Sequence, residues 1–357
     1  MTVSDRVHDG LMWASVFHEY GGLEKLRYER IPRPAVGRDD VLIQVRATGV
    51  NAFDIMVREG SYKPNKTFPH ILGEDIAGVV AGVGPEVREP FRPGQRVFVY
   101  AAVGCGRCEM CLAGSPNVCV HYQYFGAHLP GGYAQYVTVP SFNVVSMPDT
   151  ISFEEGAAFV LNFLTSWHEL VTRAQVRPGE TVLVLAAGSG IGIAAIQILK
   201  LVGCRVIATA STEDKLRRAK ALGADDLINY REQDFQKEVM RLTGKRGVDV
   251  VFENVGSTTW DQSVRSLTRG GRLVTCGGTA GYDVTMNVAH VFHKELIIIG
   301  SNHGTKRELL AMLPLLAAGK LRPIVDKVFP LKDARAAHEY IQDRRVFGKV
   351  VLVPEHD

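Results

Sequence analysis

Four cysteines in the first half of the chain stand at a spacing that could hold a metal ion. They are Cys105, Cys108, Cys111 and Cys119. The pattern C-x2-C-x2-C-x7-C lets four thiolates converge on a tetrahedral Zn²⁺, and four protein ligands leave no open position for a substrate. We therefore expect one structural zinc ion in a lobe that spans residues 104–120. The remaining cysteines, Cys204 and Cys276, stand in predicted strands, so a metal in a reducing compartment explains the set better than disulfides do.

A glycine-rich turn between two apolar stretches could hold the pyrophosphate of a dinucleotide. Residues 181–200 read TVLVLAAGSGIGIAAIQILK, a β-branched strand that runs into the turn and on into a helix, whose first N–H groups would face the ligand. The residues expected to bind it are Ala187, Gly188, Ser189, Gly190, Ile191 and Gly192. The dinucleotide fingerprint is met loosely, because Ala187 and Ser189 replace its first two glycines. A tight turn without a ligand is therefore the alternative.

The end of the next predicted strand, residues 204–210, favours NADP(H) over NAD(H). Ala210 stands about twenty residues beyond the glycines, where a carboxylate would bind the ribose 2′-OH of NAD(H) and repel a 2′-phosphate. Ser211 and Lys215 offer a hydroxyl donor and a positive charge instead. An ordinary helix start with Ser211 or Thr212 as its N-cap is the alternative, and it is compatible with the first reading.

The chain as a whole has the composition of an ordinary globular enzyme. Its 357 residues predict two domains, and its 41 basic and 38 acidic residues leave a net charge of only +3. That charge is too small and dispersed to predict a nucleic-acid or membrane partner. The N-terminal residues lack the basic start and apolar run of a signal peptide, so we expect a cytoplasmic protein.

The order of the predicted elements indicates an α/β protein of two domains. Short β-like runs separated by Gly and Pro turns predict a mostly β domain over residues 1–163. Strands and helices then alternate and predict a doubly wound parallel sheet of six strands over residues 164–306. The tail, residues 307–357, carries further β-like runs and is expected to return to the first domain. The cleft between two such domains is the default ligand site.

These motifs together resemble the medium-chain dehydrogenase/reductase superfamily over essentially the whole chain. The segments that carry the resemblance are GVNAFDIMVREGSY at 49–62, LGEDIAGVV at 72–80, the cysteine run, LTSWHEL at 164–170, the glycine turn and VDVVFENVG at 248–256. The cysteine lobe resembles zinc-containing alcohol dehydrogenases, whereas GVNAFD and the ribose-binding stretch resemble NADPH:quinone and enoyl reductases. The resemblance implies a GroES-like catalytic domain, a Rossmann domain, and assembly as a homodimer or homotetramer.

Matched to the alcohol dehydrogenases, the chain departs from the pattern that binds their catalytic zinc. The three matching residues are Asn51, Glu74 and Leu161, of which Leu161 has no ligand atom and the Asn51 amide is a poor one. Without a Lewis acid, an alcohol has no evident activating agent. The expected reaction is therefore hydride transfer from NADPH to a small electrophilic substrate, an activated C=C bond or a quinone.

The resemblance also implies roles for single residues. Asn51 matches the polar residue of zinc-free reductases, Tyr62 matches the proton donor of enoyl thioester reductases, and Thr165 matches the residue that packs behind the nicotinamide. Four further residues complete the expected cofactor site: Tyr230, Asn254, Gly300 and Lys349. Asn51 could equally hold a turn, and Tyr62 could be an aromatic packed over the cleft.

Two other functions remain open at this stage. An alcohol or carbonyl dehydrogenase would need a metal held by Glu74 and Asp75, and a non-catalytic NADPH-binding sensor would bind the cofactor without turnover.

Asp54 and Arg58 are expected to form a structural ion pair. The histidines show no metal spacing and are expected to be structural, among them His128 and His303.

Overall fold

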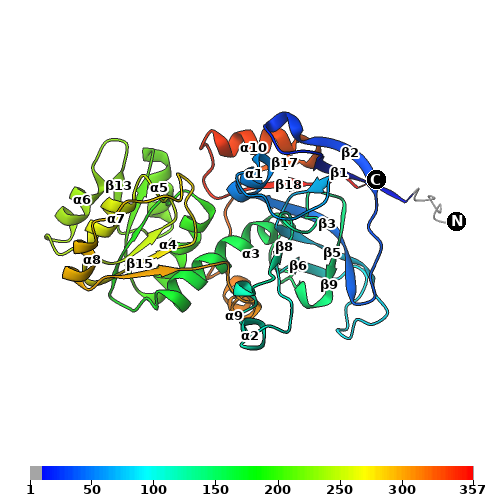
Figure 1. The fold of residues 1–357 in the computed structure, drawn as a ribbon, viewed down its shortest axis with the longest axis horizontal. Coiled ribbons are helices and arrows are strands. Elements are labelled where there is room, and N and C mark those ends of the chain that lie inside the picture. The colour runs from blue at the N-terminus through cyan, green and yellow to red at the C-terminus, as the bar shows by residue number, and fades with distance from the viewer. Residues whose placement is uncertain (1–9, 357) are drawn as a thin grey trace.

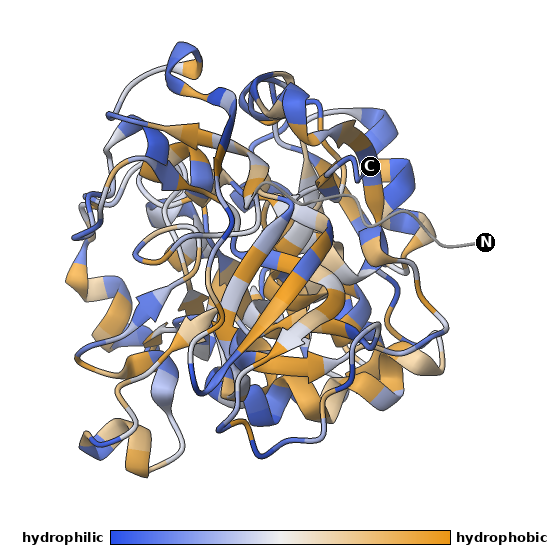
Figure 2. Ribbon diagram, turned by 90° about the vertical axis from the view of Figure 1, so that its right-hand side faces the viewer, coloured by the Kyte–Doolittle hydropathy of each residue, from blue (hydrophilic) through white to orange (hydrophobic). Residues whose placement is uncertain are grey.

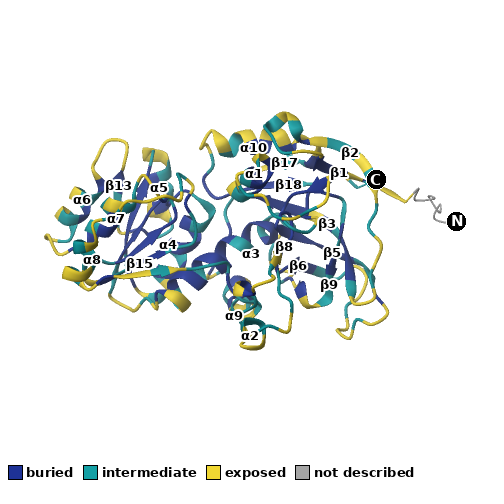
Figure 3. Ribbon diagram, in the orientation of Figure 1, coloured by how far each residue is buried: buried dark blue, intermediate teal, exposed yellow. Residues whose placement is uncertain are grey.

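The computed structural model describes residues 10–356, which form two lobes side by side (Figure 1). The blue and red ends of the chain share one lobe, and the green and orange middle forms the other. The central strands of both lobes are buried, whereas edge strands and the outer helix faces are exposed (Figure 3). The tail therefore returns to the first domain. The exact boundaries after residues 163 and 306 stay predictions, because a single helix, α3 (Phe153–Trp167), runs across the first of them.

The first lobe is built on antiparallel β-structure. Its main sheet follows the order β10-β6-β5-β3-β18-β17, with β9 also paired to β3. These strands are β10 (Val144–Ser146), β6 (Arg96–Val99), β5 (Asp75–Val83), β3 (Asp40–Val50), β18 (Lys349–Val353), β17 (Val325–Pro330) and β9 (Tyr136–Pro140). A smaller sheet joins β2 (Arg27–Pro32), β1 (Leu11–Phe17) and β4 (His70–Ile71). Figure 2 looks onto this lobe, and hydrophobic residues colour much of its strands.

The second lobe is a parallel sheet in the order β13-β12-β11-β14-β15-β16. The strands are β11 (Thr181–Val184), β12 (Arg205–Ala210), β13 (Asp226–Asn229), β14 (Val248–Glu253), β15 (Leu267–Thr275) and β16 (Ile297–Gly300). Its helices are α4 (Gly190–Val202), α5 (Glu213–Ala221), α6 (Phe235–Leu242), α7 (Trp260–Ser266) and α8 (Val288–Lys294). The strand order reverses between the parallel strands β11 and β14, and the crevice at the carboxyl ends of the strands at such a point binds ligands in doubly wound sheets.

Helix α3 fixes the two lobes against each other. A capping box starts it, because Ser152 accepts a hydrogen bond from the backbone N–H of Glu155 and the Glu155 side chain bonds back. The helix packs on β3 and β5 of the first lobe and on α4 of the second. It then continues as a π-helical segment, His168–Arg173, an irregularity that often accompanies a functional site.

The remaining elements frame the cleft and the cysteine lobe. They are α1 (Ala52–Glu59), β7 (Ala102–Val103), α2 (Glu109–Leu112), β8 (Gln123–Tyr124), α9 (Lys306–Ala317) and α10 (Ala334–Gln342). The expected six-strand sheet is confirmed, although β15 begins at Leu267 and not at the expected Arg272. No helix among residues 10–356 has the length and apolar character needed to cross a membrane.

Candidate functional site

The glycine turn lies at the carboxyl end of β11, at the point where the strand order reverses. Ser189 is the N-cap of α4, and its side chain accepts a hydrogen bond from the backbone N–H of Gly192 at 3.0 Å. The left-handed residue of the turn is Ala186, with φ +49°, and not one of the glycines. The turn is nevertheless too close-packed for larger residues. A Cβ on Gly192 would lie 2.4 Å from the carbonyl oxygen of Ala186, and one on Gly190 would lie 2.4 Å from the Asn162 amide.

The carboxyl edge of the sheet also carries buried polar groups without partners. The Nδ2 of Asn254, just past β14, and the Oγ of Ser301, just past β16, have no hydrogen-bond partner among the described residues. Gly300 ends β16, and a Cβ there would meet nothing within 4 Å. Thr165 is buried on α3, one turn before the lobes separate. Buried donors need partners, so a polar ligand such as a nicotinamide dinucleotide fits this edge.

The residues expected to read the ribose gather next to the turn. Ala210 is buried at the end of β12, and Tyr230 is exposed beside it, its backbone N–H bonded to the Ala210 carbonyl. The stem of Lys215 lies against Gly188, and its ammonium donates to the backbone carbonyl of Arg344 at 2.6 Å. Burial lowers the pKa of Lys215, and nearby arginines lower it further. The Lys215 ammonium is therefore held by a backbone carbonyl of the C-terminal segment while its stem packs on the glycine turn.

The cysteine cluster has the geometry of a zinc site. The four sulfur atoms lie within 4.8 Å of one another, and those of Cys108 and Cys119 are 3.7 Å apart. Two ligands on one tetrahedral zinc with Zn–S bonds of about 2.3 Å are separated by roughly 3.8 Å. The Cys119 sulfur also accepts hydrogen bonds from the backbone N–H groups of Cys105 and His121. The backbone N–H of Cys111 lowers the pKa of Cys108 to about 6. The cluster therefore fits a structural Zn²⁺.

Asn51 lies in a buried polar network behind the cleft. Its Nδ2 donates to Asp75 at 3.0 Å, and its Oδ1 accepts from the Lys349 ammonium at 2.5 Å. Lys349 also pairs with Asp75 at 2.5 Å, and the other carboxylate oxygen of Asp75 accepts from the backbone N–H of Leu161. The side-chain atoms of Asn51 and Asp75 that could coordinate a metal ion are thus already hydrogen-bonded to protein groups. The residues present do not fit the catalytic zinc of the alcohol dehydrogenases, and Asp75 is not available as a ligand.

Glu74 has no such partners. Its side chain is buried, and its Oε1 makes no hydrogen bond among the described residues. The nearest basic group is Nε2 of His303, at 3.6 Å. His303 has φ +52°, and its ring stacks on that of Tyr124 with centroids 4.2 Å apart. The stacking explains how a side chain on a left-handed backbone keeps one orientation.

Tyr62 stands on the opposite wall, against a second histidine. Its hydroxyl lies 3.5 Å from Nε2 of His128, and its ring packs against Phe53. Burial and a hydrogen bond with Tyr122 raise the pKa of Tyr62 well above 10, and the Glu74 charge raises it further. The hydroxyl therefore keeps its proton at neutral pH.

The spacing of the histidines did not indicate that His128 would contact Tyr62 or that His303 would face Glu74. The position of His303 three residues beyond β16 could have indicated the second contact, because ligands bind at strand carboxyl ends. The expected ion pair between Asp54 and Arg58 is wrong. Asp54 instead accepts hydrogen bonds from the backbone N–H groups of Asn51 and Gly73, while Arg58 pairs with Glu59.

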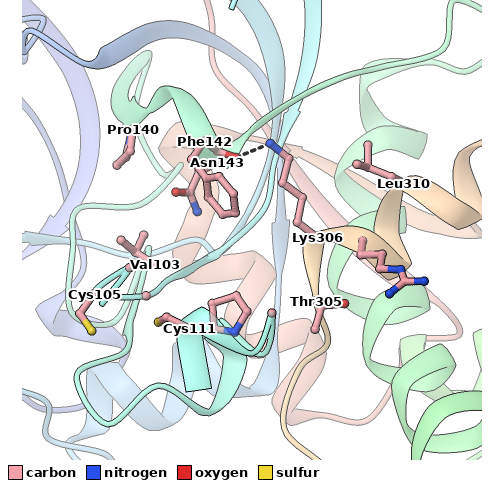
Figure 4. Close-up of a pocket in the computed structure, with 14 residues that line it drawn as sticks. Val103, Cys105, Cys111, Pro140, Phe142, Asn143, Thr305, Lys306 and Leu310 are labelled. Carbon is pink, nitrogen blue, oxygen red and sulfur yellow. Dashed lines mark hydrogen bonds between the residues drawn. The ribbon is translucent and has the colours of Figure 1, made fainter. Parts of the chain in front are cut away.

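A large cavity lies away from these residues, beside the cysteine lobe (Figure 4). It has a volume of about 940 Å³ and extends from Val103 and Cys111 to the start of α9. Lys306 crosses it to bond the carbonyl of Phe142, as the dashed line shows. None of the described residues expected to bind cofactor or substrate lines it. The large volume of this cavity is therefore no reason to assign it a role in hydride transfer.

Family models match both lobes. The model described as "Alcohol dehydrogenase GroES-like domain" matches residues 37–149, and the one described as "Zinc-binding dehydrogenase" matches residues 190–318. The chain is 30% identical over 353 residues to a quinone oxidoreductase of Mus musculus, covering 96% of this chain and 98% of that protein.

Solved structures agree with this assignment. A NAD-dependent alcohol dehydrogenase superposes with a TM-score of 0.92 at 47% identity, covering 96% of this chain and 99% of the other. The crotonyl-CoA carboxylase/reductase AntE in complex with NADP superposes with a TM-score of 0.89 at 25% identity, covering 96% and 95%. Fold, cysteine cluster and sequence therefore agree that the chain belongs to the medium-chain dehydrogenase/reductase superfamily, a family of oxidoreductases.

Proposed function

We propose that this chain is an NADPH-dependent oxidoreductase that transfers hydride to an activated C=C bond or a quinone without a catalytic zinc. The observation that carries the proposal is the commitment of the Asn51 amide to Asp75 and Lys349. With Leu161 at the third position, only Glu74 of the family's three ligand positions is left. An acceptor that is already electrophilic needs a positioned hydride and a hydrogen bond, and no Lewis acid.

Each side chain of the cleft then has one task. When bound, the reduced nicotinamide supplies the hydride. Thr165 packs behind the nicotinamide and limits which face reacts. Asn51 keeps its second amide hydrogen for the substrate oxygen, because only one is used by Asp75. Tyr62 holds the proton that adds to the carbon next to the carbonyl.

The preference for NADPH rests on the residues at the end of β12. Ala210 brings no carboxylate to the ribose, and Lys215 brings positive charge. The similar proteins differ in their cofactor, since two are named NAD-dependent alcohol dehydrogenases and one reductase was solved with NADP. They divide on the reaction as well, between quinone or enoyl-thioester reduction and alcohol oxidation.

Alcohol or carbonyl oxidoreduction remains the second candidate, because Glu74 faces His303. Their 3.6 Å separation is close to that of two ligands on one tetrahedral metal, about 3.4 Å for bonds of 2.0–2.1 Å. Two protein ligands are one fewer than the usual catalytic set. This candidate requires a second metal ion per chain, whereas the first requires one.

We also propose that the chain forms a homo-oligomer through β16, an edge strand of the parallel sheet. Ile297 and Ile298 on this strand are 52% and 38% exposed, and Phe292 on α8 is 62% exposed. An apolar edge strand is a pairing surface, and pairing with a second copy would extend the sheet and bury it.

A panel of substrates with NADPH oxidation as the readout tests the reaction. The proposal expects turnover of quinones and enones and none of simple ketones, with the reverse reaction absent for plain alcohols. Tight NADPH binding without turnover of any acceptor would contradict it and favour a sensing role. Oxidation of plain alcohols that depends on a second metal would favour the other candidate.

A further inference from the structure

His128 is held by contacts with three tyrosines. Its Nδ1 accepts a hydrogen bond from the backbone N–H of Tyr124 at 3.2 Å, and its own backbone N–H donates to the Tyr124 carbonyl at 2.9 Å. The ring packs edge-on against the rings of Tyr62 and Tyr122, with centroids 6.0 and 5.7 Å away. The imidazole therefore has one orientation.

The same contacts determine where its proton resides. Burial lowers the pKa of His128, and the positive charge of Lys66 lowers it further, so the ring is neutral at pH 7. Of the other titratable groups nearby, burial lowers the pKa of His70 to about 4 and that of Lys66 to about 8, whereas the Glu74 carboxylate acts on Tyr62. A neutral imidazole has one N–H, and a nitrogen that accepts a hydrogen bond cannot carry it. Since Nδ1 accepts from Tyr124, the proton is on Nε2.

This tautomer gives the Tyr62 hydroxyl a direction. The Nε2 of His128 lies 3.5 Å from the Tyr62 oxygen and, being protonated, donates to it. The oxygen is then an acceptor, and its own hydrogen must point elsewhere. A substrate carbonyl or enolate beside Tyr62 can then receive that hydrogen.

We propose that His128 is the positioning residue that turns the Tyr62 hydroxyl into a proton donor toward the substrate. The inference rests on the proposed reduction of an enone by NADPH. Hydride adds to the β-carbon and the C=C electron pair moves to form an enolate. The Tyr62 O–H bond breaks, its proton bonds to the α-carbon, and its electron pair stays on oxygen as a phenolate. The Nε2–H of His128 stabilises that phenolate until water returns the proton.

The first test is the tautomer itself, which needs no substrate. In ¹⁵N-labelled protein at pH 7, the proposal expects the His128 ring to show a protonated Nε2 and an unprotonated Nδ1. An Nδ1–H tautomer or an imidazolium would overturn the proposal, even if enone reduction is confirmed.

The second test compares two substitutions at this position. His128→Leu removes the donor and should slow enone reduction at least about tenfold in kcat, with KM little changed. Quinone reduction should stay within about twofold, because quinone products take protons from water. His128→Gln keeps an N–H donor and should recover most of the lost rate. A matched His290→Leu substitution, on α8 and away from the cleft, should change neither activity.

A double substitution separates positioning from folding. If His128 acts only through Tyr62, adding His128→Leu to Tyr62→Phe should cost no further enone activity. Equal losses for quinone and enone in His128→Leu would show a structural role and overturn the proposal. Absence of any reduction by the wild type would instead remove the proposed function, while leaving the tautomer result standing.

Discussion

The ammonium nitrogen of Lys349 lies 2.5 Å from Oδ2 of Asp75, and both side chains are buried. The stem of Lys349 reaches this place by passing Gly49, where a Cβ would lie 2.5 Å from Cε of the lysine. Asn51 bonds both members of the pair. The Lys349 ammonium therefore already bonds the Asp75 oxygen that a metal ion at this position would need as a ligand.

The cysteine lobe should bind one zinc ion per chain. Native mass spectrometry should find one tightly held zinc in the wild type. The Cys108→Ser variant should lose the zinc ion and become less stable to unfolding, because the three remaining sulfur ligands cannot complete the tetrahedral coordination. Cys204→Ser, a buried cysteine outside the cluster, is the matched control and should keep its zinc. Two zinc ions in the wild type, or none, would contradict the assignment.

NADPH should bind at least tenfold more tightly than NADH, a difference of about 1.4 kcal/mol that a few charge-assisted hydrogen bonds can supply. Lys215→Ala should remove most of this difference, because it deletes the positive charge whose stem packs against Gly188 of the turn. Arg217→Ala is the control, since this exposed arginine of the same helix pairs with Asp214. Titration of both cofactors decides, and equal affinities in the wild type would refute the interpretation of Ala210.

Glu169→Gln should stabilise the protein at high pH more than at low pH. Burial raises the pKa of Glu169 well above 4.5, and both its oxygens lack hydrogen bonds of ordinary geometry, with the Cys276 thiol beside them. The folded protein keeps the proton that the unfolded chain releases, so the wild type loses stability as pH rises above about 4.5. Gln cannot titrate.

Thermal unfolding at pH 5 and pH 8 measures this effect. The melting temperature of Glu169→Gln relative to the wild type should rise between the two values. Glu154→Gln, at the exposed start of α3, should show no such trend. A constant difference for Glu169→Gln would show that the carboxyl group is ionised in the folded protein.

The β16 edge should govern assembly. Phe292→Glu with Ile297→Glu places charge on the exposed apolar edge and should reduce the mass measured by light scattering to that of a monomer. Leu201→Glu, which alters an exposed leucine on α4, should leave assembly unchanged. A monomeric wild type, or an unaffected double variant, would contradict pairing through this strand.

The fold could be predicted because its signals are local. The buried strands of the second lobe read as continuous β-branched runs, and β13 has the expected bounds, Asp226–Asn229. The cysteine cluster was equally visible, since its four ligands come from fifteen consecutive positions. Such features depend on short stretches whose chemistry allows few arrangements.

The cleft could be predicted only in part, because it joins residues from distant stretches. Glu74 and His303 are 229 positions apart, and no spacing rule links them. Lys349 was expected to contact the pyrophosphate, but its ammonium is bound to Asp75, a partner that only the pairing of β18 with β3 brings close. Its contact with the cofactor stays a prediction, as do the other site residues.

The central claim, a metal-independent reduction in which Tyr62 donates the proton, is tested most directly by Tyr62→Phe. With NADPH oxidation as the readout, enone reduction should fall by roughly ten- to a thousandfold, in the range of general acid groups. Quinone reduction by the same variant should stay nearly unchanged, and neither protein should oxidise a plain secondary alcohol. Chelator-sensitive alcohol oxidation by the wild type, with indifference to quinones and enones, would contradict the claim and establish the metal-dependent reaction instead.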